Sequence, residues 1–188
     1  MVNVTLKLLP TKKQEHTLVR YVGGCRFIWN YLLDVQSERR KTGGHLMTPK
    51  EMHDTLHDLE KQKSCSWLRS MPYNSLKVTI EELGDAIHKY KHDEGEFPRF
   101  ESRKKGVMEL PLMGGMWHGF AFVDDSHILI AKVGKVRFEG EGEFPTGAGQ
   151  MLISPRVYMD GKNWYATFGM KTEDKNESRN QRCGSSRA

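Results

Sequence analysis

The first ten residues hold a single β-strand that has no neighbouring strand in the sequence. Val2, Val4, Leu6 and Leu8 recur at period two, and Pro10 ends the run. Helical patterns follow as far as about residue 92, and strand-like patterns return only after residue 106. Because the backbone groups of a strand need hydrogen-bond partners, we expect this strand to pair with the later sheet. The helices are then an insertion into a β domain.

Two helices are predicted in the first part of the insertion. Thr11 and Gln14 have the spacing of a capping box, which predicts a short helix over 11–21 that ends at Gly23-Gly24. A second helix is predicted over 25–41, because apolar residues gather on one arc of a helical projection.

Two further helices complete the predicted bundle, which makes four helices over 11–92. Thr48-Pro49-Lys50-Glu51 repeats the capping-box pattern, with proline at the first helical position. Pro72 opens the last helix. Its apolar stripe consists of Leu76, Ile80, Leu83, Ile87 and Tyr90.

Short alternating runs rich in β-branched and aromatic residues follow Gly95 and predict strands. The predicted strands are 107–112, 117–123, 127–138, 151–159 and 163–170. The segments 124–126 and 160–163 carry Asp, Gly, Ser and Asn in the manner of hairpin turns. Residues 172–188 have almost no apolar side chains, and we expect a disordered tail there.

These elements predict an α+β fold, in which a β-barrel-like domain is interrupted by an inserted helical bundle. The expected domains are 1–10 with 96–171, then 11–95 inserted between them, and the tail 172–188. With 37% apolar residues in 188, the chain can bury a core.

The charge balance favours polyanions as partners. Lys and Arg number 29 against 24 Asp and Glu, and the sequence pI is about 9.1. Cys25, Cys65 and Cys183 are odd in number and widely spaced, which predicts neither a disulfide framework nor a zinc knuckle. With neither a signal-peptide pattern nor an apolar run of membrane-spanning length, we expect a cytoplasmic protein without membrane partners.

The segment FPRFESRKK at 97–105 is the first candidate for nucleic-acid binding. Phe97 and Phe100 flank Arg99, and a basic triplet follows, made of Arg103, Lys104 and Lys105. Aromatic rings and cations together are how proteins hold nucleic-acid strands, by stacking and by phosphate contact. The alternative is a solvated basic linker in which the two phenylalanines anchor the core.

A second basic feature lies on the predicted strand over 127–138. Lys135 and Arg137 share one face of that strand, while Val136 and Phe138 share the other. A basic sheet face suits a phosphate backbone, and an ordinary solvated face is the alternative.

His53 and His57 stand at i and i+4 with Asp54 between them, close to a zinc-protease pattern. Aspartate is shorter than the glutamate of that pattern, and spacing places no third ligand. His88 and His92 repeat the same spacing. We therefore interpret these histidines as helix-surface residues and expect no metal or other cofactor.

No catalytic residues are predicted. The sequence has no nucleophile elbow, no phosphate-binding Gly-rich loop ending in Lys-Ser/Thr, and no acid cluster in the strand context of a two-metal nuclease.

Seven motifs occur in order along the chain. They are Leu6-Lys7-Leu8-Leu9-Pro10-Thr11 with Gln14, Gly24-Cys25-Arg26-Phe27-Ile28-Trp29-Asn30, Ser66-Trp67-Leu68, Leu76 to Tyr90, Phe97-Pro98-Arg99-Phe100, Lys132-Val133-Gly134-Lys135-Val136 and Trp164-Tyr165. Taken together, they resemble the N-terminal part of the TnpB/OrfB family of transposon-encoded RNA-guided endonucleases, relatives of type V CRISPR effectors. The resemblance covers about residues 2–170.

The resemblance implies a β-barrel wedge domain split by a helical recognition domain, both contacting guide RNA and target DNA. It implies scaffold or backbone contacts for Arg26, Asn30 and Arg99. For reading a motif that flanks the target, it implies the stretches that hold His53, Tyr73, Asn74 and Lys77.

In that family a RuvC-like nuclease domain follows the strand that matches Trp164 to Phe168, and this sequence has only a polar segment there. The resemblance therefore implies a nucleic-acid-binding protein without the metal-binding acids of the nuclease, by truncation or by a frame change. Two alternatives stay open: one half of a split endonuclease whose RuvC part is a separate chain, or a protein that inhibits a larger nucleic-acid effector.

Overall fold

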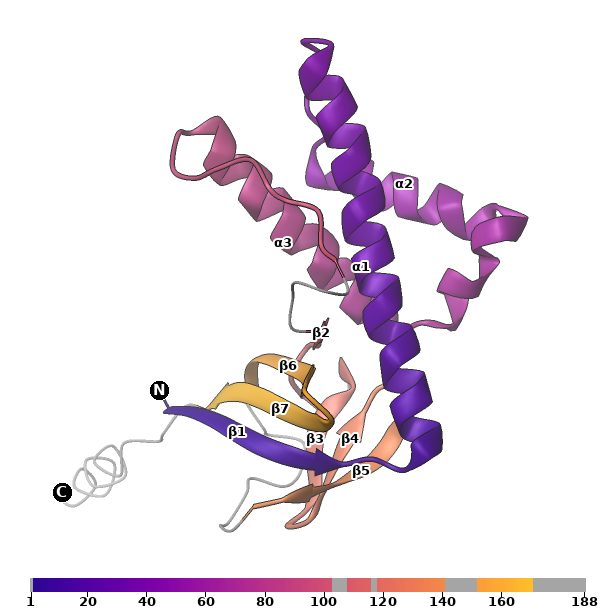
Figure 1. The fold of residues 1–188 in the computed structure, drawn as a ribbon, viewed down its shortest axis with the longest axis vertical. Coiled ribbons are helices and arrows are strands. Elements are labelled where there is room, and N and C mark those ends of the chain that lie inside the picture. The colour runs from indigo at the N-terminus through magenta and orange to yellow at the C-terminus, as the bar shows by residue number, and fades with distance from the viewer. Residues whose placement is uncertain (1, 103–107, 116–117, 141–151, 171–188) are drawn as a thin grey trace, which may run out of the picture.

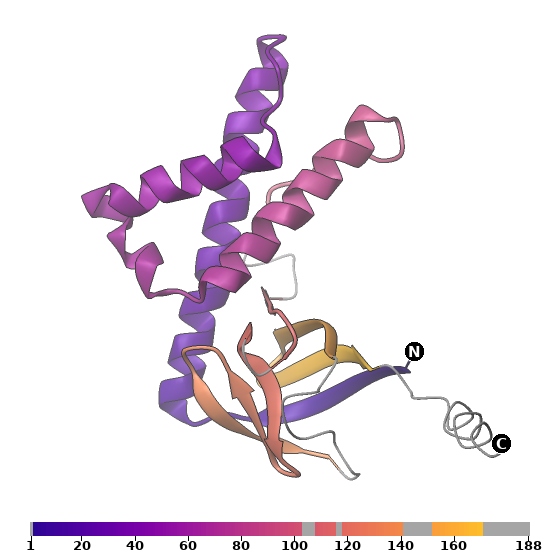
Figure 2. The same cartoon turned by 180° about the vertical axis from the view of Figure 1, so that it is seen from behind.

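The computed structural model describes residues 2–102, 108–115, 118–140 and 152–170. Within them, three α-helices and one 3-10 helix stand over a seven-stranded sheet (Figures 1 and 2). The mixture of helices and sheet confirms the α+β class. The predicted tail 172–188 lies outside the described residues.

The N-terminal strand lies inside the sheet, as predicted. The strand order is β2-β6-β7-β1-β5-β4-β3, and β1 is antiparallel to both of its neighbours, β7 and β5. Leu6 and Leu8 of β1 are buried, as the alternation required, whereas Val2 at the strand's start is exposed. The strands are β1 Val2–Leu9, β2 Met108–Pro111, β3 Phe120–Asp124, β4 His127–Ile130, β5 Gly134–Glu139, β6 Leu152–Asp160 and β7 Asn163–Met170.

The sheet is curved but open. Phe122 of β3 packs edge-on against Phe168 of β7 with ring centroids 5.5 Å apart, although β1, β5 and β4 lie between those strands in the sheet. The concave side therefore closes around its own aromatic core. In the described residues β2 and β3 remain the two edges, so the closed form of the predicted barrel is not observed.

The first helix corrects the prediction of a break at Gly23-Gly24. α1 runs without interruption over Lys12–Lys41, and Thr11 with Gln14 forms the predicted capping box at its start. A β-carbon on Gly24 would lie 2.0 Å from Met71 Sδ and 3.2 Å from Trp67 Cζ3. Gly24 therefore allows Met71 and Trp67 to approach α1 closely. Helix propensity alone could not distinguish this role from a helix end.

The rest of the bundle consists of α2 Pro49–Lys61, a 3-10 helix η1 over Lys63–Ser70, and α3 Tyr73–Lys91. The capping box at Thr48 and the buried stripe of α3 are as predicted, with Tyr90 only partly buried. The count of four α-helices was wrong, because the first two predicted helices are one and η1 was not predicted.

The predicted strand over 127–138 is two strands. Residues 131–133 form a turn between β4 and β5, with Lys132 at φ 58° and Gly134 at φ 96°. The Lys132 ammonium donates to the carbonyl oxygens of Arg69 (3.2 Å) and Met71 (2.5 Å), just before α3. This turn thereby connects the sheet to the bundle.

Gly23 and Gly24 give a matched pair of substitutions. Gly23→Ala should raise the free energy of unfolding by about 0.5–1 kcal/mol, because alanine favours the helix and the nearest atom is Arg26 Nη2, 3.8 Å away. Gly24→Ala should lower it by about 1 kcal/mol net, because overpacking against Met71 exceeds the gain in propensity. Urea unfolding of both variants measures the difference; equal stabilisation would show that the contact at Gly24 costs nothing.

Candidate nucleic-acid interface

The outward side of β5 carries two cations that have no acid opposite them in the ladder. Lys135 and Arg137 are exposed and alternate with buried Val136 and Phe138, as predicted. Across the ladder, Lys135 lies opposite Leu129, and Arg137 lies opposite Leu9 and His127. Neither cation has an ion-pair partner among the described residues. Their charge is therefore available to a ligand.

The first turn of α1 brings more positive charge to this strand. Gln14 Nε2 donates to the carbonyl oxygen of Lys135 at 2.8 Å, which fixes the start of α1 against β5. Lys12 and Lys13 in that turn are exposed, and in the described part of the chain they form no ion pair. We call Lys12, Lys13, Lys135 and Arg137 the β5 strip.

An aromatic pair lies on the same outward side, two strands away. Tyr158 of β6 stacks on Tyr165 of β7 with ring centroids 5.5 Å apart and an interplanar angle of 25°. Tyr165 lies opposite Lys7 of β1, and Lys7 pairs with Glu139 of β5 at 2.9 Å. The sequence analysis missed this pair, although each tyrosine alternates with buried residues. Only the register of the β6–β7 hairpin brings them together.

The residues expected to read a flanking motif lie on separate helices. Tyr73 and Lys77 are on the first turns of α3, where Tyr73 is 57% exposed and Lys77 approaches Glu81 at 3.6 Å. The Asn74 amide donates to the carbonyl oxygen of His118 at 3.2 Å. His53 is half-buried on α2. A shared role for these residues stays a prediction.

The segment FPRFESRKK is described only in part, since Arg103, Lys104 and Lys105 lie outside the described residues. Phe97 packs against Tyr90 (5.1 Å between centroids), and the Arg40 guanidinium lies 4.7 Å from the Phe97 ring centre. Phe100 is 56% exposed, so the idea that both phenylalanines anchor the core was wrong for Phe100. Arg99 is exposed and pairs with Glu96 at 2.5 Å.

Arg26 and Asn30 lie close to this segment on α1. The Asn30 amide group donates to the carbonyl oxygen of Glu101 (2.9 Å) and accepts from its N–H (2.8 Å). Arg26 lines a cleft of about 500 Å³ beside Asn30 and Phe100. Burial raises the pKa of the Glu101 carboxyl, and Arg26 partly opposes that shift.

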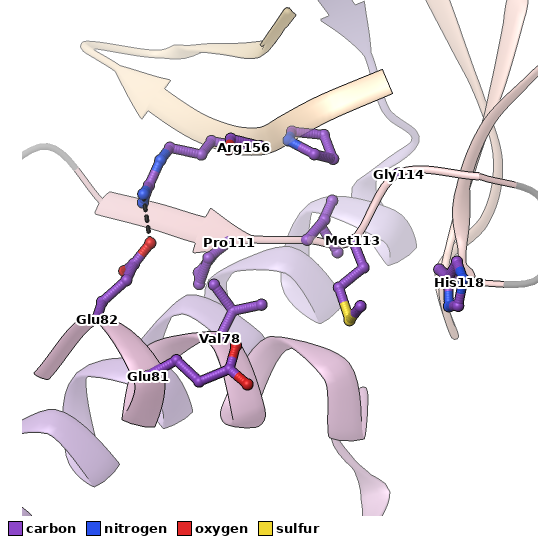
Figure 3. Close-up of a pocket in the computed structure, with 11 residues that line it drawn as sticks. Val78, Glu81, Glu82, Pro111, Met113, Gly114, His118 and Arg156 are labelled. Carbon is purple, nitrogen blue, oxygen red and sulfur yellow. Dashed lines mark hydrogen bonds and ion pairs between the residues drawn. The ribbon is translucent and has the colours of Figure 1, made fainter. Parts of the chain in front are cut away.

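A polar junction between the bundle and the sheet was not predicted. Arg156 of β6 pairs with Glu82 of α3 and, at 3.2 Å, with Glu109 of β2. Figure 3 shows Arg156 and Glu82 pointing toward one another across a pocket of about 420 Å³ between α3 and the β2 and β6 segments. Burial lowers the pKa of Arg156, but the two carboxylates outweigh it and the net shift is upward. No local sequence pattern predicts the contact between Glu82 and Arg156, which are 74 positions apart.

The described residues contain no group of three or more metal-binding side chains. His57 Nδ1 lies 3.9 Å from Glu60 Oε2, on the same helix. The described helices include none that is both long and apolar enough to cross a bilayer.

Comparison with known proteins gives two findings. Residues 2–45 match the helix-turn-helix domain family of OrfB proteins of the IS605 type. The chain is also 28% identical over 169 residues to InsQ of Escherichia coli (strain K12), whose name describes a candidate RNA-guided DNA endonuclease. That alignment covers 89% of this chain and 40% of InsQ, so the chain spans less than half of its relative's length.

Both findings point to proteins encoded by insertion sequences. They support the resemblance to the TnpB/OrfB family that the motifs of the sequence suggested. The part that matches the helix-turn-helix family is, in this structure, strand β1 followed by the single long helix α1.

The junction at Arg156 gives a test of how the bundle is held to the sheet. Arg156→Gln should lower the free energy of unfolding by about 2 kcal/mol, because it leaves two partly buried carboxylates without their cation. Lys61→Gln, which removes an exposed pair with Asp58 at 2.9 Å, is the control and should cost about 0.5 kcal/mol or less. Chemical denaturation measures both losses. Equal losses would show that the Arg156 junction stabilises the fold no more than an exposed ion pair does.

Proposed function

We propose that this chain binds RNA through the outward side of its sheet. The observation that carries the proposal is the β5 strip, with four cations that have no acidic partner among the described residues. A single-stranded polyanion gains from such a strip by releasing counterions. The stacked pair Tyr158 and Tyr165 adds a flat apolar surface of the kind on which bases stack.

The resemblance to the TnpB/OrfB family supports RNA binding and adds target DNA as a second expected partner. A relative named for RNA-guided DNA cleavage must hold a guide, and this chain aligns with part of that relative. We propose that the sheet is the wedge domain and that residues 11–95 are the recognition domain inserted in it. Target DNA would then contact the start of α3, where Tyr73 is exposed.

The β5 strip can be tested by its salt dependence. The variant Lys135→Gln with Arg137→Gln should bind a 20-nucleotide single-stranded RNA about ten-fold more weakly than the unchanged chain at moderate salt. The slope of log K against log salt should become shallower by about 1.4, since each neutralised phosphate contributes about 0.7 for single strands. Fluorescence anisotropy across a salt series measures both quantities.

The matched control is Lys41→Gln with Lys61→Gln, because these lysines are exposed but already pair with Glu38 and Asp58. It should leave affinity and slope nearly unchanged. If both double variants lowered the slope equally, binding would depend on net charge and the strip would have no special role. An RNA affinity that did not respond to salt would contradict the proposal itself.

A further inference from the structure

A cleft on α1 has aromatic walls and has no role in the RNA contact proposed for the sheet. Its volume is about 500 Å³, and its lining is mostly apolar. It lies beside the segment 99–101, whose backbone is hydrogen-bonded to Trp29 and Asn30 of α1. The lining residues are Gly23, Arg26, Phe27, Asn30, Tyr31, Asp34 and Phe100. We call it the α1 cleft.

The cleft lining includes the aromatic ring of Phe100, which is exposed although the backbone on either side of it is fixed. The Trp29 indole N–H donates to the carbonyl oxygen of Arg99 at 3.0 Å, and Asn30 pairs with both backbone groups of Glu101. These hydrogen bonds hold the residues on either side of Phe100. Burying a phenylalanine ring would stabilise the fold, yet the ring of Phe100 stays 56% exposed. The chain thus holds a stacking surface in place without using it for its own core.

The lining also includes two aromatic side chains of α1. Phe27 and Tyr31 lie one turn apart with ring centroids separated by 6.0 Å, and Trp67 supports Phe27 edge-on at 5.5 Å. Tyr31 is 37% exposed. Because rigid rings lose little conformational entropy when a ligand binds, a cleft between them is prepared for a flat apolar ligand.

Two opposite charges accompany the rings. Arg26 and Asp34 both line the cleft, and neither forms an ion pair within the described residues. A guanidinium suits a phosphate. A lone carboxylate would repel a nucleic acid unless it accepted hydrogen bonds from a base edge. Guanine presents two adjacent donors, N1–H and the N2 amino group, which match the two oxygens of a carboxylate.

We propose that the α1 cleft binds one unpaired guanine base of an RNA strand, stacked between Phe100 and the Phe27–Tyr31 face. Asp34 accepts from the Watson–Crick edge of the base, and Arg26 contacts a neighbouring phosphate. Asn30 is a positioning residue, because both its amide nitrogen and its amide oxygen are bonded to the backbone of Glu101. This proposal rests on the RNA-binding function proposed for the sheet and assigns a base preference that the β5 strip cannot supply.

The experiment uses the full chain and two uridine-rich 15-nucleotide RNAs that differ in one internal position, guanosine or adenosine. The unchanged chain should bind the guanosine RNA about ten-fold more tightly, because one good contact to a base edge contributes at that scale. Phe100→Leu keeps apolar bulk but removes the ring, and should weaken binding of the guanosine RNA about ten-fold. Phe100→Tyr keeps a ring and should bind as the unchanged chain does.

Asp34→Asn separates edge recognition from stacking. It should abolish the preference for guanosine while leaving the affinity for the adenosine RNA within about two-fold. Asp54→Asn, an exposed acid on α2 outside the cleft, is the matched control and should preserve the preference. Thermal melting of each variant establishes that the fold is intact.

The outcomes distinguish this proposal from the function on which it depends. If Phe100→Leu and Asp34→Asn left both RNA affinities unchanged while Lys135→Gln with Arg137→Gln still weakened binding, the cleft proposal would be overturned and RNA binding by the sheet would stand. If no variant mattered because the chain bound neither RNA, the proposed function would fail first. If Phe100→Leu instead changed only the oligomeric state in light scattering, the cleft would be a protein contact and the proposal would be wrong.

Discussion

The position of β1 in the middle of the sheet determines the arrangement of the whole chain. Seven residue pairs join β1 to β7 and three join it to β5, so the N-terminus holds the two halves of the sheet together. The strand comes first in the sequence, and its partners are formed more than a hundred residues later. The chain therefore leaves the sheet after β1, forms the bundle and re-enters the sheet at the edge strand β2. The contacts of Gln14 with Lys135 and of Lys132 with Met71 hold the bundle against β5 and the turn before it.

Local patterns predicted the elements whose causes are local. The capping boxes at Thr11 and Thr48 and the alternation of β1 and β5 were recognisable because each depends on residues close in sequence. The pairing of β1 with the later sheet followed from hydrogen-bond satisfaction alone. Gly24 was misinterpreted as a helix end. Glycine is needed there because Met71, 47 positions away, packs against this point of α1, and no local rule includes so distant a residue. The stacking of Tyr158 on Tyr165 likewise depends on the pairing register of β6 and β7, which local sequence patterns do not predict.

Several cations outside the β5 strip are neutralised by nearby acids, and this pairing separates structural charge from available charge. On the helices, Lys41, Lys61 and Lys77 each have an acid three or four positions away, as helical geometry allows. On β5 the residues opposite Lys135 and Arg137 in the ladder are not acids, and Glu139 on the same face pairs with Lys7. Net charge alone could not locate this surface, since the excess over the whole chain is only +5. Pairing, more than composition, identifies the side of the molecule that can bind a polyanion.

The two phenylalanines of FPRFESRKK show how one segment can serve both the fold and a ligand. Phe97 is held between Tyr90 and the Arg40 guanidinium, which fixes the return from α3. Phe100, three residues later, is fixed through its neighbours' backbone and leaves its ring exposed. Because the Trp29 and Asn30 side chains hold this backbone, a substitution at Asn30 would affect a ligand in the α1 cleft through the position of Phe100. A loss of RNA binding in an Asn30 variant would therefore report on the placement of Phe100, and only variants of the ring itself can establish a contact with the base.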